Sequence, residues 1–250
     1  MRAGNLIGVF DHITIRASDR EATERFYDTV LATLGIEKTH SGADFAEWDD
    51  FSVAAAGAER PVTRRLHIGF VAPSRAHVDE FWRAGTAAGY RDDGAPGPRP
   101  QYKEDYYGSF LLDPDGNSAE AVHHNSMRTG GNVDHLWLRV ADLAASSDFF
   151  ETIAPHAGLR MNRDTPERVR FQGSSGTFSV LSGEPTEHVH IAFPASRDET
   201  VDAFHAAALA AGYADAGPPG ERPRYHPGYY AAYVTDPAGF TIELVNHNRG

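Results

Sequence analysis

Two glutamates interrupt short apolar runs at matching places in the sequence. Glu120 stands in DPDGNSAEAVHH, which begins at Asp113, and Glu243 stands in DPAGFTIELVNH, which begins at Asp236. Each segment predicts a turn followed by a short strand with a single carboxylate inside it. A carboxylate in the middle of an apolar strand needs a chemical reason.

The two segments start 123 residues apart (236 minus 113), and other segments repeat at the same offset. FDHITIRASD matches VDHLWLRVAD, and LHIGFVAPSR matches VHIAFPASRD, so each pair aligns two histidines. The pattern indicates a tandem duplication. It predicts one domain at residues 1–124 and another at residues 133–250, joined by a polar, glycine-bearing linker at residues 125–132.

Apolar periodicity predicts the order β-α-β-β-β twice in each copy. The elements expected in the first copy are a strand at 8–16, a helix at 19–34 between the N-cap Asp19 and the stop Gly35, strands near 45–56, a strand at 65–71, a helix at 75–88, an irregular Pro/Gly segment, and strands near 107–112 and 117–122.

The unusual polar residues take equivalent places in these elements: a histidine in each first strand and a glutamate in each last strand. His67 stands beside Gly69, and His190 stands beside Ala192, so small neighbours leave room for a bound group. The chain has no cysteine, so any metal must be held by His, Asp, Glu, carbonyls or water. A single histidine in a strand is usually structural, but four histidines and two glutamates repeated at a fixed offset indicate metal binding. The candidate ligands are His12, His67, Glu120, His135, His190 and Glu243.

With these residues the sequence resembles a tandem member of the vicinal oxygen chelate superfamily, which includes glyoxalase I, bleomycin-resistance proteins and extradiol dioxygenases. The resemblance extends from Val9 to Asn248. It implies an α+β fold in which paired βαβββ units curl into an open barrel around a cleft with a divalent metal. It carries the ligand roles over as one triad per copy. These triads are His12, His67 and Glu120, then His135, His190 and Glu243.

The fourth protein ligand usual in glyoxalase I-like members has no counterpart, because the corresponding strands read FSVAAAG and FSVLSG. Two histidines and one carboxylate form the set expected for non-haem Fe(II), which is the favoured cofactor. Mn²⁺, Zn²⁺, Co²⁺ and Ni²⁺ suit the same ligands. The expected function is a dioxygenase-type reaction on a small oxygen-rich molecule. The alternatives are a metal-dependent isomerase or lyase, and a resistance protein that sequesters a small molecule.

The segment YHPGYYAAYVTDPAGFTIE resembles extradiol dioxygenases further, because it has a His and a Tyr ahead of the ligand Glu. The first copy has Lys103 and Phe110 at the positions of His226 and Tyr233. The centre assigned to the second copy is therefore expected to be the more active one. The expected catalytic residues are His226, Tyr233, Tyr230 and Tyr107, and the expected substrate-binding residues are Lys103 and Arg224.

The composition limits the partners. A formal net charge of -12 disfavours binding to nucleic acid and to anionic membranes. No run approaches the roughly 18 apolar residues of a transmembrane helix, and the N-terminus has no signal-peptide pattern. We expect a small-molecule substrate, a cytoplasmic location, and a chain that is a monomeric pseudo-dimer or forms a homodimer.

Overall fold

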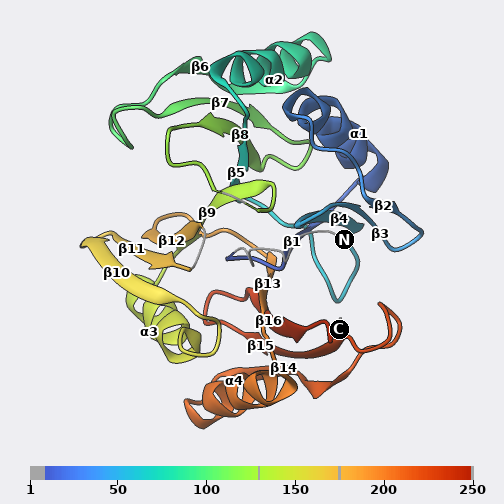
Figure 1. The fold of residues 1–250 in the computed structure, drawn as a ribbon, viewed down its shortest axis with the longest axis vertical. Helices are drawn as coiled ribbons and strands as arrows, with labels where there is room; N and C mark the ends of the chain where they lie inside the picture. Colours follow the sequence, from blue (N-terminus) through green and yellow to red (C-terminus); the bar gives the residue numbers. More distant parts are fainter. Residues whose placement is uncertain (1–8, 129, 174–175, 249–250) are drawn as a thin grey trace. The chain divides into compact units, whose positions relative to one another are not determined.

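The computed structural model describes residues 9–128, 130–173 and 176–248. Residue 8 of the predicted first strand and residue 129 of the predicted linker lie outside these ranges. The chain runs through four successive β-α-β-β-β units (Figure 1). The first copy contains β1 (His12–Ala17), α1 (Arg20–Leu31), the 3₁₀ turn η1 (Ala32–Leu34), β2 (His40–Ser41), β3 (Phe45–Trp48), β4 (Phe51–Ala55), β5 (His67–Val71), α2 (Arg75–Ala87), β6 (Arg91–Pro98), β7 (Tyr107–Leu112) and β8 (Ser118–His123). The second copy contains β9 (Val133–Val140), α3 (Leu143–Ile153), β10 (Arg160–Thr165), β11 (Arg168–Gln172), β12 (Thr177–Ser182), β13 (His190–Pro194), α4 (Asp198–Ala210), β14 (Ala214–Glu221), β15 (Tyr230–Thr235) and β16 (Thr241–Asn246). This order confirms the predicted α+β fold of paired βαβββ units.

The chain divides into two compact units whose boundaries fall inside two strands. One unit is Thr14–Trp137, and the other joins the residues up to Ile13 with those from Leu138 onward. The beginning of β1, with His12, therefore belongs to the unit that holds most of the second copy. The beginning of β9, with His135, belongs to the unit that holds most of the first copy.

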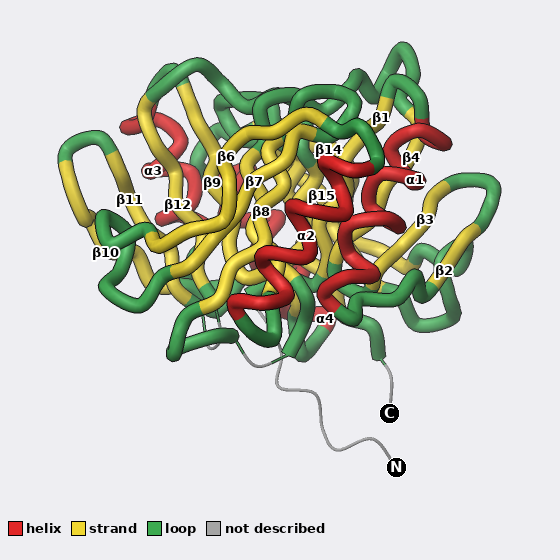
Figure 2. The backbone as a smooth tube through the Cα atoms, turned by 90° about the horizontal axis from the view of Figure 1, so that it is seen from above, coloured by secondary structure: helices red, strands yellow, loops and turns green. Residues whose placement is uncertain are grey.

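Mixed sheets bring the first and last strands of a βαβββ unit together. β5 runs parallel to β8, while β7 is antiparallel to β8 and β6 is antiparallel to β7. In the other unit β13, β16, β15 and β14 pair in the same way. α2 packs on β6, β7 and β8 and lies beside α1 (Figure 2), and α4 packs on β14, β15 and β16. The parallel pairs set a first-strand histidine close to a last-strand glutamate.

Local sequence explains where the helices begin and end. Asp19 caps α1, because its side chain accepts a hydrogen bond from the backbone N–H of Ala22, and Gly35 ends the helical segment in the left-handed conformation with φ 75°. Asp142 caps α3 in the same way through Ala145. These contacts confirm the predicted cap and stop. No helix of the described residues is long and apolar enough to span a membrane.

The segment at residues 91–98 is a strand, so the prediction of an irregular Pro/Gly segment is wrong there. β6 lies at the edge of its sheet, where a proline needs no N–H for a further neighbour. Its pairing with β7 shifts register around Gly94 and Gly97, which absorbs the irregular backbone. β14 repeats this arrangement against β15. Edge position and bulges therefore override the low strand propensity of glycine and proline.

Candidate metal centres

Three side chains converge in the Thr14–Trp137 unit: His67 from β5, Glu120 from β8 and His135 from β9. Nε2 of His67 lies 3.0 Å from Oε2 of Glu120 and 3.3 Å from Nε2 of His135. Nε2 of His135 lies 3.3 Å from the same glutamate oxygen. Two imidazole nitrogens and a carboxylate oxygen facing one point fit the donor set of a divalent metal. We call this cluster the His67 centre.

A second cluster, the His12 centre, forms in the other unit from His12, His190 and Glu243. Nε2 of His190 lies 2.9 Å from Oε2 of Glu243, and Nε2 of His12 lies 3.6 Å from that oxygen. The two imidazole rings are stacked with centroids 5.3 Å apart. In both centres the ligand atoms lie within 4.8 Å of one another, so each centre fits one metal ion.

The six expected ligands meet in two groups of three, but the grouping of one triad per copy is wrong. The structure exchanges the first-strand histidines, so that His12 joins His190 and His135 joins His67. The exchange follows from strand pairing. The beginning of β9 pairs antiparallel with β5, which puts His135 opposite Gly69. Just before β1, the backbone N–H of Asp11 donates to the carbonyl of Ala192, at 2.8 Å.

Gly69 leaves the space that the His135 ring fills. A Cβ atom at Gly69 would lie 2.4 Å from Cε1 of His135, closer than any real contact. The small residue beside His67 therefore has a packing role, because it admits the third ligand. At the matching position of the other copy, Ala192 already carries a Cβ.

Gly69→Ala is expected to displace the His135 ring and to weaken metal binding at the His67 centre. The loss should be about 10- to 100-fold, as when a partner of a metal ligand is removed. Titration of metal-free protein with Zn²⁺ measures both affinities, and the His12 centre is the internal control. Unchanged affinity at both centres would contradict this role of Gly69.

Four of the six candidate ligands are oriented by a further hydrogen bond. Tyr106 donates its hydroxyl proton to Oε1 of Glu120 at 2.6 Å, and Tyr229 donates to Oε1 of Glu243 at 2.7 Å. Nδ1 of His135 lies 2.9 Å from the Asp134 carboxylate, and Nδ1 of His12 lies 2.9 Å from that of Asp11. An Nδ1–H bond to a carboxylate leaves Nε2 as the metal-binding atom. The two aspartates were not expected from the sequence, and of the four neighbouring tyrosines the expected catalytic ones were Tyr107 and Tyr230 instead of Tyr106 and Tyr229.

Opposite charges in the His67 centre stabilise one another. Burial acts to raise the pKa of Glu120, but hydrogen bonds and charges from His135 and His67 lower it to about 2. Burial acts to lower the pKa of His135, but Asp134 and Glu120 raise it to about 10. Without a metal, the two carboxylates therefore favour the protonated form of His135, so metal binding there is expected to release a proton.

The two centres differ in exposure. The side chains of His12 and His190 are 21% and 16% exposed, whereas those of His67 and His135 are 7% and 9% exposed. The Trp137 ring lies over the buried pair, with its centroid 4.8 Å from that of His67 and 5.8 Å from that of His135. The matching position of the other copy is Thr14 (137 minus 123). The His12 centre is thus the one that a substrate reaches more easily.

Tyr233 lies beside the His12 centre. It pairs across the strands with Glu243, and its ring centroid is 6.2 Å from that of His190. Its hydroxyl oxygen is buried beside the Glu243 carboxylate and makes no hydrogen bond of good geometry to any of the described residues. Burial and the charge of Glu243 raise the pKa of Tyr233, so the hydroxyl keeps its proton and acts as a donor.

His226 reaches the His12 centre through other residues. Its Nε2 lies 2.9 Å from Nδ1 of His247, whose Nε2 lies 2.7 Å from Oδ2 of Asp11. Its Nδ1 lies 2.8 Å from the carbonyl oxygen of Pro227. Both nitrogens of His226 therefore have partners, and the ring is connected to His12 only through His247 and Asp11.

Two other expected catalytic residues point away from the centres. The hydroxyls of Tyr107 and Tyr230 donate to Asp79 and Asp202, each at 2.8 Å. Successive residues of extended chain face opposite sides, so when Tyr106 and Tyr229 reach the ligand glutamates, the following tyrosines face the helices.

The two expected substrate-binding residues contact groups outside both centres. Lys103 donates to the hydroxyl of Ser126 and lies 3.8 Å from Asp105. Arg224 is exposed and donates to the hydroxyl of Tyr225 at 3.0 Å. The structure therefore brings neither cation into contact with a ligand histidine or glutamate.

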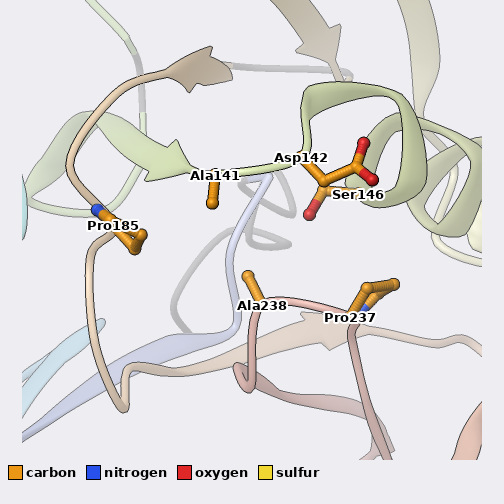
Figure 3. Close-up of a pocket in the computed structure, with 6 residues that line it drawn as sticks. All are labelled: Ala141, Asp142, Ser146, Pro185, Pro237 and Ala238. Carbon is orange, nitrogen blue, oxygen red and sulfur yellow. The ribbon is translucent and has the colours of Figure 1, made fainter.

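A pocket of about 260 Å³ lies elsewhere in the unit of the His12 centre (Figure 3). It is lined by Ala141, Asp142, Ser146, Pro185, Pro237 and Ala238. The first copy has Ser18 and Asp115 where this copy has Ala141 and Ala238, and the Ser18 hydroxyl donates to Asp115 at 2.6 Å. The pocket is therefore the space left where two alanines replace that hydrogen-bonded pair, and it contains no ligand of either centre.

Paired βαβββ units with two-histidine, one-glutamate centres define a class of metal-binding α+β proteins. The family model described as Glyoxalase/Bleomycin resistance protein/Dioxygenase superfamily matches residues 9–121 and 132–244. The chain belongs to this superfamily. The superfamily includes enzymes, among them glyoxalases and dioxygenases.

Two solved structures share this fold over nearly the whole chain. Glyoxalase I from Zea mays is 17% identical, with a TM-score of 0.68 over 95% of this chain and 92% of that one. A candidate dioxygenase from Bacillus subtilis is 17% identical, with a TM-score of 0.64 over 99% of this chain and 87% of that one. At such identities the likeness shows the fold alone. No curated protein matches the chain in sequence.

Proposed function

We propose that the chain is a metal-dependent enzyme that acts on a small, oxygen-rich substrate at the His12 centre. Fe(II) is the favoured metal, and a dioxygenase-type reaction is the favoured chemistry. The observation that carries this proposal is that the ligand atoms of His12, His190 and Glu243 lie within 4.8 Å of one another. Asp11 orients His12, Tyr229 orients Glu243, and His190 contacts Glu243. A divalent metal bound there would supply a Lewis acid that polarises two neighbouring oxygens of the substrate.

The residues around the metal ligands have separate roles in orienting the ligands and in binding the substrate. Asp11 holds the His12 ring, and Tyr229 holds Glu243, so the ligands are oriented before a metal arrives. Tyr233 offers a protonated hydroxyl that makes no protein hydrogen bond of good geometry, which suits hydrogen bonding to a substrate oxygen. His247 contacts Asp11 and His226 contacts His247, so these two rings extend the hydrogen-bond network behind the His12 ring.

The second candidate is a metal-dependent isomerase or lyase. The same ligand set and the same Tyr233 donor would serve proton transfer next to a polarised carbonyl, with no need for dioxygen. A protein that only sequesters its ligand is disfavoured, because the chain keeps two complete ligand sets with orienting partners.

The native metal and oxygen uptake distinguish these candidates. Protein purified without chelator is expected to contain iron, and to consume O₂ when mixed with a panel of catechols under air. His190→Ala is the control, because it breaks the His12 centre and should abolish uptake. Nickel or zinc with no O₂ uptake, together with isomerisation or cleavage of a carbonyl substrate, would favour the second candidate. If the protein, with or without metal, binds the tested small molecules and releases all of them chemically unchanged, sequestration would be favoured.

A further inference from the structure

Arg222 carries a positive charge beside the His12 centre and has no carboxylate partner among the described residues. Its guanidinium carbon lies 5.6 Å from the centroid of the Tyr233 ring. Two of its nitrogens donate to backbone carbonyls of its own loop, to Pro218 at 2.6 Å and to Glu221 at 3.2 Å. These bonds hold the planar group in place and leave further N–H donors for a ligand. In a chain with 35 acidic and 23 basic residues, a fixed cation without an acidic partner calls for a reason.

Tyr233 gives a second, independent sign of a ligand. Its hydroxyl oxygen lies buried beside the Glu243 carboxylate without a hydrogen bond of good geometry, although buried polar atoms are nearly always well hydrogen-bonded. The centroid of the same ring is 5.6 Å from the guanidinium carbon of Arg222 and 6.2 Å from the centroid of the His190 imidazole. The guanidinium of Arg222 and the hydroxyl of Tyr233 are thus both close to the candidate metal ligand His190, since the Tyr233 ring neighbours both residues.

The other copy shows which part of this arrangement belongs to the fold. Arg99 lies 5.4 Å from the Phe110 ring and donates to the carbonyls of Ala95 and Pro98, at 2.7 and 3.2 Å. The loop therefore places an arginine over an aromatic ring in both copies. Only the second copy adds a hydroxyl, and only there is the neighbouring centre more exposed.

We propose that Arg222 and Tyr233 form a subsite for an anionic oxygen group, a carboxylate or a phosphate, on the substrate of the His12 centre. The proposal rests on the proposed function, because it assumes a substrate held by a metal at that centre. A guanidinium suits either group, since its parallel N–H bonds match two oxygens. The substrate class is then a small molecule with two neighbouring oxygens for the metal and a separate anionic group for Arg222.

Hydroxamates that chelate through two neighbouring oxygens provide matched probes. Acetohydroxamate has no second anionic group, succinomonohydroxamate adds a carboxylate, and phosphonoacetohydroxamate adds a phosphonate. Binding to Zn²⁺-loaded His135→Ala protein, which keeps only the His12 centre intact, is measured by calorimetry. At least one anionic probe is expected to bind about tenfold or more tightly than acetohydroxamate, as for hydrogen bonds to a charged group.

Arg222→Gln is expected to remove most of that preference, Arg222→Lys to retain part of it, and Arg99→Gln to leave it unchanged. The ratio of affinities is the readout, because a loosened loop would weaken all probes alike. Failure of acetohydroxamate to bind would overturn the metal centre and hence the proposed function. If acetohydroxamate binds and the anionic probes show no preference, or the preference survives in Arg222→Gln, the subsite alone is overturned.

Discussion

His12→Ala is expected to remove the metal from one centre and to lower turnover by more than about 10²-fold, whereas His135→Ala should leave turnover largely intact. A bound metal contributes several kcal/mol of transition-state stabilisation, and about 1.4 kcal/mol corresponds to tenfold in rate. The His12 centre is more exposed and has the Tyr233 donor, whereas the His67 centre is buried beneath Trp137. Metal content and initial rate, measured on the same samples, check the prediction.

Pairs of variants test the grouping of the ligands separately from activity. His12→Ala combined with His190→Ala alters one centre, so the double variant should keep one metal ion per chain. His12→Ala combined with His135→Ala alters both centres and should keep none. If the first pair loses both ions, the grouping is wrong. If turnover is lost in His135→Ala and kept in His12→Ala, the buried centre is the active one.

The offset of 123 residues predicts which positions are equivalent, but it does not predict which of them are neighbours. The periodicity and the caps of α1 predicted the other elements but not β6, because they depend on local sequence, whereas β6 depends on its edge position beside β7. The exchange of His12 and His135 depends on how β9 pairs with β5 and how Asp11 meets Ala192. Such pairing between distant segments leaves no local pattern in one sequence.

Some residues of the site had a usable signal in the sequence. Asp11 and Asp134 directly precede the first-strand histidines in both copies, and Tyr106 and Tyr229 repeat at the same offset. A carboxylate next to a metal-binding histidine is the usual orienting partner, so the repeat alone supported a role for the aspartates. Arg222 also repeats, as Arg99, but its value as a site residue depends on the neighbouring ring, which only the structure gives.

Arg128→Met is expected to lower the free energy of unfolding by about 3 to 5 kcal/mol, the usual cost of breaking a buried ion pair on one side. Arg128 lies in the segment expected to be a linker, and its guanidinium is 3.1 Å from Oδ2 of Asp50, with side chains 2% and 6% exposed. It also donates to the carbonyl of Val133. Asp50 accepts hydrogen bonds from the backbone N–H groups of Asn132 and Val133. Urea unfolding of metal-free protein measures the effect.

Matched variants separate the buried charge from general damage. Arg83 forms a surface pair with Glu80, with side chains 69% and 43% exposed, so Arg83→Met should change stability little. Arg128→Met combined with Asp50→Leu should recover part of the loss, because no charge is then left buried without a partner. A double variant less stable than Arg128→Met would show that lost packing, and not the unpaired Asp50 carboxylate, causes most of the destabilisation.

The pH dependence gives the sharpest test of this mechanism. Burial raises the pKa of Asp50, and the charge of Arg128 acts in the opposite direction. A carboxyl group whose pKa is raised in the folded state destabilises the fold when it ionises. This loss of folding free energy is present at pH values above the raised pKa and disappears as the pH falls below it. The stability deficit of Arg128→Met should therefore shrink on acidification, whereas a packing defect would persist.

Because Asn132 and Val133 lead directly into Asp134 and His135, the variant should also weaken metal binding at the His67 centre and spare the His12 centre.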